Sequence, residues 1–150
     1  MNDKANFFYN KALEYFDDKL GNQITFSNVL DEIGKKIFRE PFKGVYPVDK
    51  IPELNEGDVC VINVDNSKLP GSHWVGCGMH DNRLYVYDSF GRNQDKLKNM
   101  YDLLMKKKYK NIKEPDNDAE QDIKENNCGQ RSLAWIFVFK VLGPDYSLYV

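Results

Sequence analysis

The chain has few of the residues and motifs that mark metal, nucleotide and membrane proteins. It holds two histidines and three cysteines in 150 residues, and neither CxxC nor HExxH spacing occurs. We therefore expect no metal site and no cofactor. There is no glycine-rich phosphate loop, and no apolar run approaches the length that spans a bilayer. A net charge of −2 gives no global attraction for nucleic acid or membranes.

The cysteine count is odd, and the polar N-terminus carries no apolar targeting segment. Both features favour free thiols in a reducing compartment. The hydrophobic share of 41% is enough for a packed core and argues against a disordered chain. We expect one domain over residues 1–150, with N-terminal helices in residues 1–40 and a catalytic core in residues 42–142. We expect the chain to be a monomer.

Hydrophobic periodicity predicts the order of the elements. Helices are predicted over residues 4–20, 27–38, 94–107 and 129–142, and strands over 58–64, 73–79, 83–87 and 109–112. Residues 42–52 and 114–127 are predicted to be irregular, and Ser27 to cap the second helix. The last helix is apolar on almost every side, so we expect it to be buried. This order predicts an α+β fold with a central, mostly antiparallel sheet packed against that helix.

Cys128 follows a polar segment and directly precedes the last apolar helix. Unpaired backbone N–H groups and the helix dipole favour negative charge at such a position, so the sulfur is a candidate nucleophile. A buried, inert cysteine is the commoner role, and Cys60 and Cys77, inside apolar strand patterns, fit it better.

His73 and Asp88 lie on two strands that the turn at residues 80–82 joins. An antiparallel hairpin centred there places residues 73 and 88 opposite each other with their side chains on one face. His73 is then a candidate general base, and Asp88 a candidate partner that orients its ring. The alternatives are a solvated role for His80, in the turn, and a simple turn cap for Asp88.

Gln121 lies in the polar segment before Cys128. Its side-chain amide, with the backbone N–H of Cys128, is a candidate pair of donors for an oxyanion. Taken alone, a glutamine in a polar loop is more typical of a solvated residue. Lysines cluster between Asp88 and Gln121, and this cluster, Lys96–Lys113, is typical of a solvated helix face, with weak DNA contact as the sharper alternative.

Together these motifs resemble the adenain-like cysteine proteases, the maturation protease group of adenoviruses, virophages and polinton-like elements. The matching pieces are Gly71-Ser72-His73-Trp74, Tyr87-Asp88-Ser89-Phe90-Gly91, and Gln121 with six residues before Cys128-Gly129. The group belongs to the wider clan of SUMO-deconjugating proteases. Asp88 matches that wider clan, whereas adenovirus enzymes commonly carry Glu there.

The resemblance implies a cysteine endopeptidase that cleaves viral structural precursors during capsid maturation, located in the virion and the host cytoplasm. It implies His73 as base, Asp88 as its partner, Gln121 as oxyanion donor and Cys128 as nucleophile. Only residues 129–150 follow Cys128, fewer than in adenovirus enzymes, so we expect no activating peptide or DNA cofactor. Two alternatives remain: a protease for ubiquitin-like modifiers, and a non-catalytic binding module.

Overall fold

The computed structural model describes residues 2–21, 25–64, 73–89, 98–106, 112–113 and 127–150. Its helices are α1 (Asn2–Leu20), α2 (Ser27–Phe38), α3 (Lys98–Lys106), α4 (Cys128–Val141) and α5 (Pro144–Ser147), with a 3₁₀ turn, η1, at Val48–Lys50. Its strands are β1 (Phe42–Pro47), β2 (Val59–Asn63), β3 (Trp74–His80), β4 (Arg83–Tyr87) and β5 (Ile112–Lys113). This is an α+β fold, as the sequence predicts.

The described strands form one sheet in the order β1-β2-β3-β4-β5. The central pairs β2–β3 and β3–β4 are antiparallel, whereas the outer pairs β1–β2 and β4–β5 are parallel. The sheet is therefore mixed, and the prediction of a mostly antiparallel sheet is wrong at its edges. One parallel edge comes from β1, because residues 42–52 are predicted to be irregular but residues 42–47 pair with β2. The other comes from β5, which pairs in parallel with β4.

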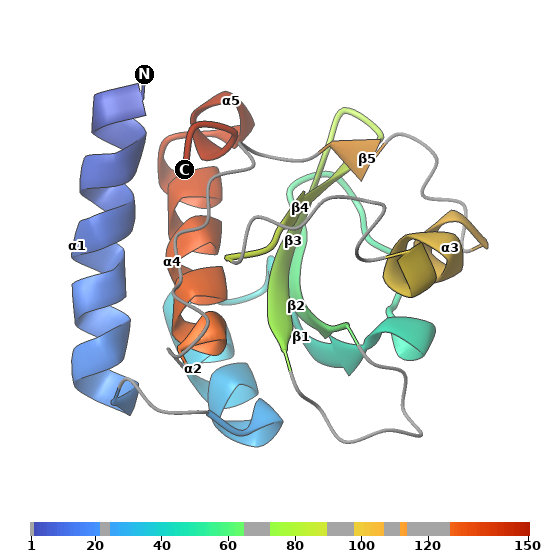
Figure 1. Ribbon diagram of the computed structural model, residues 1–150, viewed down its shortest axis with the longest axis horizontal. Coiled ribbons are helices and arrows are strands. Elements are labelled where there is room, and N and C mark those ends of the chain that lie inside the picture. Colours follow the sequence, from blue (N-terminus) through green and yellow to red (C-terminus); the bar gives the residue numbers. More distant parts are fainter. Residues whose placement is uncertain (1, 22–24, 65–72, 90–97, 107–111, 114–126) are drawn as a thin grey trace.

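Two cores lie on opposite faces of the sheet, as alternating side chains require. One core joins α1, α2 and α4 to the face that carries Val59, Val61, Tyr85 and Tyr87. The other joins α3 and η1 to the face of Cys60, Ile62, Val75 and Val86. Figure 1 shows the resulting layers, with α4 between α1 and the sheet and α3 across the other face.

Two glycines of β3 bring α4 close to the sheet. A Cβ at Gly76 would lie 3.1 Å from both the carbonyl oxygen of Ser132 and the ring of Trp135. A Cβ at Gly78 would lie 2.7 Å from the ring of Phe139. Large aromatic side chains of α4 thus occupy the space that β3 leaves empty, and this close packing fixes the height of the helix over the strand.

The boundaries of α1, α2 and α4 agree with the predicted ones to within two residues. The residue that caps α2 differs from the predicted one. Ser27 is the first residue of α2, and Phe26 takes the capping position without a side-chain hydrogen bond. The predicted serine cap is therefore wrong. The short helix α5 was not predicted; Pro144 begins it, and the buried Ser147 accepts the indole N–H of Trp135 through its carbonyl oxygen.

Candidate active site

Cys128 is the first residue of α4, where the sequence places it. Its side chain is almost covered, since the residue is 8% exposed. The backbone N–H of Trp74 donates a hydrogen bond to its Sγ over 3.4 Å. Because the N–H groups of a first helical turn have no intrahelical acceptor, the sulfur lies in a region rich in backbone donors. Such a region favours an anionic sulfur.

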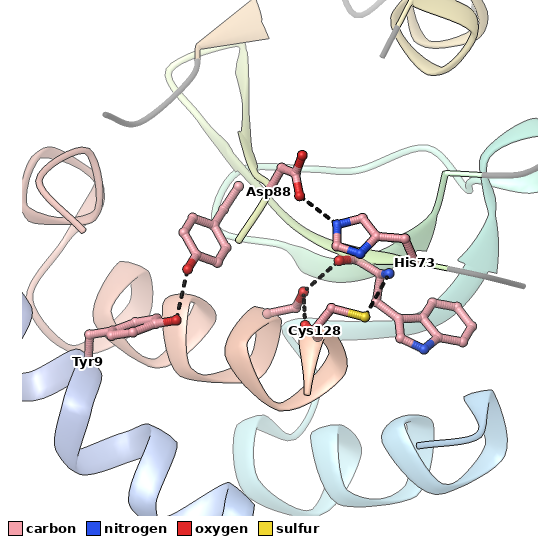
Figure 2. Close-up of polar contacts among 7 residues, drawn as sticks. Tyr9, His73, Asp88 and Cys128 are labelled. Carbon is pink, nitrogen blue, oxygen red and sulfur yellow. Dashed lines mark hydrogen bonds and ion pairs between the residues drawn. The ribbon is translucent and has the colours of Figure 1, made fainter. Parts of the chain in front are cut away.

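His73 and Asp88 meet where β3 begins and β4 has ended. The Nε2 atom of His73 lies 2.5 Å from Oδ1 of Asp88, and both side chains are buried. Asp88 therefore holds the ring in one orientation and can stabilise its charged form. Figure 2 shows the ring between the carboxylate of Asp88 and the sulfur of Cys128.

The hairpin register differs from the predicted one by two residues. His80 pairs with Arg83 and Gly76 with Tyr87, so the turn consists of Asp81 and Asn82, whose φ angles are both positive. Such two-residue turns match the twist of a hairpin and favour Asp and Asn. A shift of two preserves the face of every side chain. Residues 73 and 88 thus become diagonal neighbours instead of direct partners, still within reach of each other.

The protonation of His73 depends on its two neighbours. Burial acts to lower the pKa of His73, but the hydrogen bond to Asp88 and the neighbouring Cys128 outweigh it and hold the pKa above the ordinary value. Because Nε2 faces Asp88, Nδ1 is the ring nitrogen that can exchange a proton with the thiol of Cys128. A histidine that is held by a carboxylate beside a cysteine sulfur is the arrangement that can activate a cysteine as a nucleophile.

Ser132 connects the segment of Cys128 to the sheet through hydrogen bonds, and no sequence pattern assigned a role to this residue. Its hydroxyl lies 2.8 Å from the carbonyl oxygen of Cys128 and 3.2 Å from that of Trp74. It is fully buried, one turn after Cys128. The single serine of this helix lies four residues, or one turn, after the candidate nucleophile, and that spacing is the signal that could reveal it.

The other two cysteines and the second histidine lie in surroundings that differ from those of Cys128 and His73. Cys60 and Cys77 face each other across β2 and β3, both fully buried as free thiols. Burial, and then the neighbouring Cys60, raise the pKa of the Cys77 thiol well above its usual range, so Cys77 does not fit a nucleophile. Cys60 is equally buried, so a substrate has no access to its sulfur. His80 ends β3 and is not simply solvated, because its Nδ1 lies 2.7 Å from Oε2 of Glu56.

Some predicted site residues lie outside the described residues. Gln121 is one of them, so the predicted oxyanion pair is represented here by Cys128 alone. Much of the lysine cluster also lies outside, since only residues 98–106 and 112–113 of that stretch are described. The structure thus brings together His73, Asp88 and Cys128.

The described residues contain no group of three or more His, Cys, Asp or Glu side chains placed to hold a metal ion. Among the helices that the structure describes, none is both long and apolar enough to cross a bilayer. No protein-family model matches the chain, and no curated protein sequence matches it.

Proposed function

We propose that the chain is a cysteine endopeptidase that cleaves peptide bonds through a thioester. The observation that carries the proposal is the contact of 2.5 Å between Nε2 of His73 and Oδ1 of Asp88, on a ring that lies beside the sulfur of Cys128 (Figure 2). A base held by a buried carboxylate beside a sulfur at a helix N-terminus is the arrangement that nucleophilic acyl transfer requires.

In the first half of the reaction, the Cys128 thiolate attacks the substrate carbonyl carbon and forms a tetrahedral intermediate. The backbone N–H of Cys128 and the amide of Gln121 stabilise the oxyanion in this proposal. The His73 imidazolium gives its proton to the leaving amine as the C–N bond breaks. The acyl group is then held on Sγ as a thioester.

In the second half, neutral His73 takes a proton from water, which attacks the thioester carbonyl. The C–S bond breaks, the carboxylic acid product leaves, and the thiolate–imidazolium pair is restored. Asp88 stays ionised throughout and holds the ring toward the sulfur. Each step uses groups of this chain and one water molecule.

For the substrate, we propose viral structural precursors, processed during capsid maturation in the virion or the host cytoplasm. The resemblance of the His73, Asp88 and Gln121–Cys128 motifs to adenain-like proteases supports this assignment. A protease for ubiquitin-like modifiers is the second candidate, because Asp88 matches the acidic residue of the SUMO-deconjugating branch.

Cleavage of a matched substrate panel tests the proposal. Purified chain is incubated with capsid-precursor peptides and with fluorogenic SUMO and ubiquitin conjugates, beside the Cys128→Ala variant as control. Cleavage of the precursor peptides alone supports the maturation protease. Cleavage of a modifier conjugate alone moves the substrate to the second candidate, and equal turnover by Cys128→Ala removes the assigned nucleophile.

A further inference from the structure

Helix α1 lies outside the resemblance, yet a chain of buried and partly buried polar contacts connects it to both sides of the candidate active site. The hydroxyl of Tyr9 on α1 lies 2.8 Å from the hydroxyl of Tyr87, the last residue of β4 (Figure 2). Both tyrosines are buried, at 1% and 2% exposure. Tyr87 directly precedes Asp88, the partner of His73.

The hydroxyl of Tyr9 is also connected, through Arg131, to the residue that precedes Cys128. Nη1 of Arg131 donates to the Tyr9 oxygen over 3.2 Å, and Nε of Arg131 donates to Oδ1 of Asn127 over 3.1 Å. Asn127 directly precedes Cys128 and is itself buried. The planar guanidinium makes both contacts at once, which a single ammonium group is poorly shaped to do.

Tyr9 therefore stands between two backbone segments that hold reacting groups. Because the Tyr9 oxygen accepts a hydrogen bond from Arg131, the Tyr9 hydroxyl can donate its own hydrogen bond to Tyr87. The rings of Tyr9 and Tyr87 meet edge to face at 6.0 Å, and Tyr87 stacks on Trp135 of α4 at 5.8 Å. Packing thus fixes the rings, and the hydroxyl pair adds a directional link between helix and strand.

We propose that Tyr9 is a positioning residue of the active site, whose hydroxyl holds the segments before Cys128 and before Asp88 in register through Arg131 and Tyr87. The inference rests on the proposed function, since it concerns the same Cys128 and His73. It gives α1 a part in the chemistry although no α1 atom touches the sulfur in any contact described above. Small misplacements of reacting groups cost up to about 10²-fold in rate, which is why such a link matters.

The test deletes single hydroxyls and leaves the rings in place. Tyr9→Phe, Tyr87→Phe and the double variant are compared with Tyr15→Phe, a control on the same helix whose side chain is 42% exposed. The probe is iodoacetamide, and the rate of alkylation at Cys128, Cys60 and Cys77 is measured by mass spectrometry across a pH series. Thermal unfolding of each variant is measured in parallel.

We expect Tyr9→Phe to slow Cys128 alkylation about tenfold at neutral pH and to move its pH profile to higher pH, because a looser imidazolium supports the thiolate less. Tyr87→Phe breaks only the contact between the two hydroxyls, so it should slow alkylation less than Tyr9→Phe. The double variant should be no slower than Tyr9→Phe, because the Tyr9 change already removes that contact. Tyr15→Phe should match the wild type. If Tyr9→Phe does not fold, Tyr87→Phe and Arg131→Lys carry the test.

Two results would overturn the inference. One is an unchanged rate and pH profile in a folded Tyr9→Phe chain, even if its melting temperature falls. The other is a double variant whose loss equals the product of the single losses. A wild-type Cys128 that reacts no faster than Cys60 would instead overturn the proposed function, and this inference with it.

Discussion

The backbone N–H of Trp74 donates to the Sγ of Cys128 across 3.4 Å, so the first residue of β3 and the first residue of α4 share one hydrogen bond. The nucleophile is therefore positioned by the sheet as well as by its own helix. His73 directly precedes Trp74, and the same strand end thus holds both the base and the donor to the sulfur. The distance between β3 and α4 decides whether the site is assembled.

Enlarging the two glycines of β3 tests this dependence. Gly78→Ala places a Cβ 2.7 Å from the Phe139 ring, and Gly76→Ala places one 3.1 Å from the Ser132 carbonyl oxygen. Each change should lower the free energy of unfolding by about 1–3 kcal/mol through overpacking. Gly76→Ala should lose more turnover for the same loss of stability, because it presses on the segment that holds Cys128. Chemical denaturation and peptide cleavage, measured on both variants, check the comparison; equal losses of turnover would contradict it.

Removal of the Asp88 charge should change the pH dependence. Hydrogen bonding to Asp88 raises the pKa of His73 against the effect of burial. In Asp88→Asn the His73 imidazolium should therefore lose its proton at lower pH. The alkaline limb of the pH–activity profile should shift to lower pH. Turnover should fall, though less than in His73→Ala. A pH profile with an unmoved alkaline limb would contradict the role of Asp88.

The same shift gives a prediction for stability. Since the pKa of His73 is raised in the folded chain from its ordinary 6.5, its stabilisation is fully present below about pH 6.5 and is lost as pH rises through the folded value. The wild type should lose part of its free energy of unfolding across that window, and Asp88→Asn should lose less. Denaturation curves collected across the window measure the difference. An equal decline of the free energy of unfolding in the wild type and in Asp88→Asn would contradict the link between Asp88 and the raised pKa of His73.

Ser132→Ala should separate positioning of the nucleophile from general stability. The change removes the hydroxyl that contacts the carbonyl oxygens of Cys128 and Trp74, and should cost about 1 kcal/mol of stability. Ser147→Ala is the matched control, because Ser147 is also buried and its hydroxyl bonds a backbone carbonyl, that of Pro144. Both variants should lose stability, but only Ser132→Ala should lose turnover. If Ser132→Ala and Ser147→Ala have equal turnover, Ser132 stabilises the fold and does not position the nucleophile.

Gln121→Ala tests the oxyanion donor that sequence alone assigns. Loss of one such donor should lower kcat by about 10²–10³-fold and leave folding unchanged. Steady-state kinetics measure the effect, with Gln121→Glu as a companion that keeps the size of the side chain but loses the amide donor. Wild-type kcat in Gln121→Ala would assign the oxyanion to other donors.

Local patterns predicted the parts of the fold that local chemistry determines. The apolar run after Asn127 predicted α4 and the place of Cys128 at its start, and the short apolar run after Asn82 predicted β4 at Arg83–Tyr87. The pairing of His73 with Asp88 followed from the hairpin alone. Its register was wrong by two because the turn was centred at residues 80–81 instead of 81–82, which a pattern of side chains with a period of two does not distinguish.

Non-local contacts account for what the sequence missed. β1 contains Gly44 and Pro47, both turn signals, and becomes a strand only because β2 lies beside it. The contacts of Ser132 and of Tyr9 join segments that are 58 and 78 residues apart, so no local pattern carries them. The tight packing of α4 on Gly76 likewise depends on a strand and a helix far apart in the chain.

The most direct test of the account is to trap the acyl group on the enzyme. A cleavable peptide ester is mixed with the chain, the reaction is stopped with acid within the first turnover, and the modified residue is identified by mass spectrometry. The account predicts one acyl group on Cys128, absent from Cys128→Ala and formed far more slowly in His73→Ala. Hydrolysis that proceeds in Cys128→Ala, or an acyl group on any other residue, would contradict it.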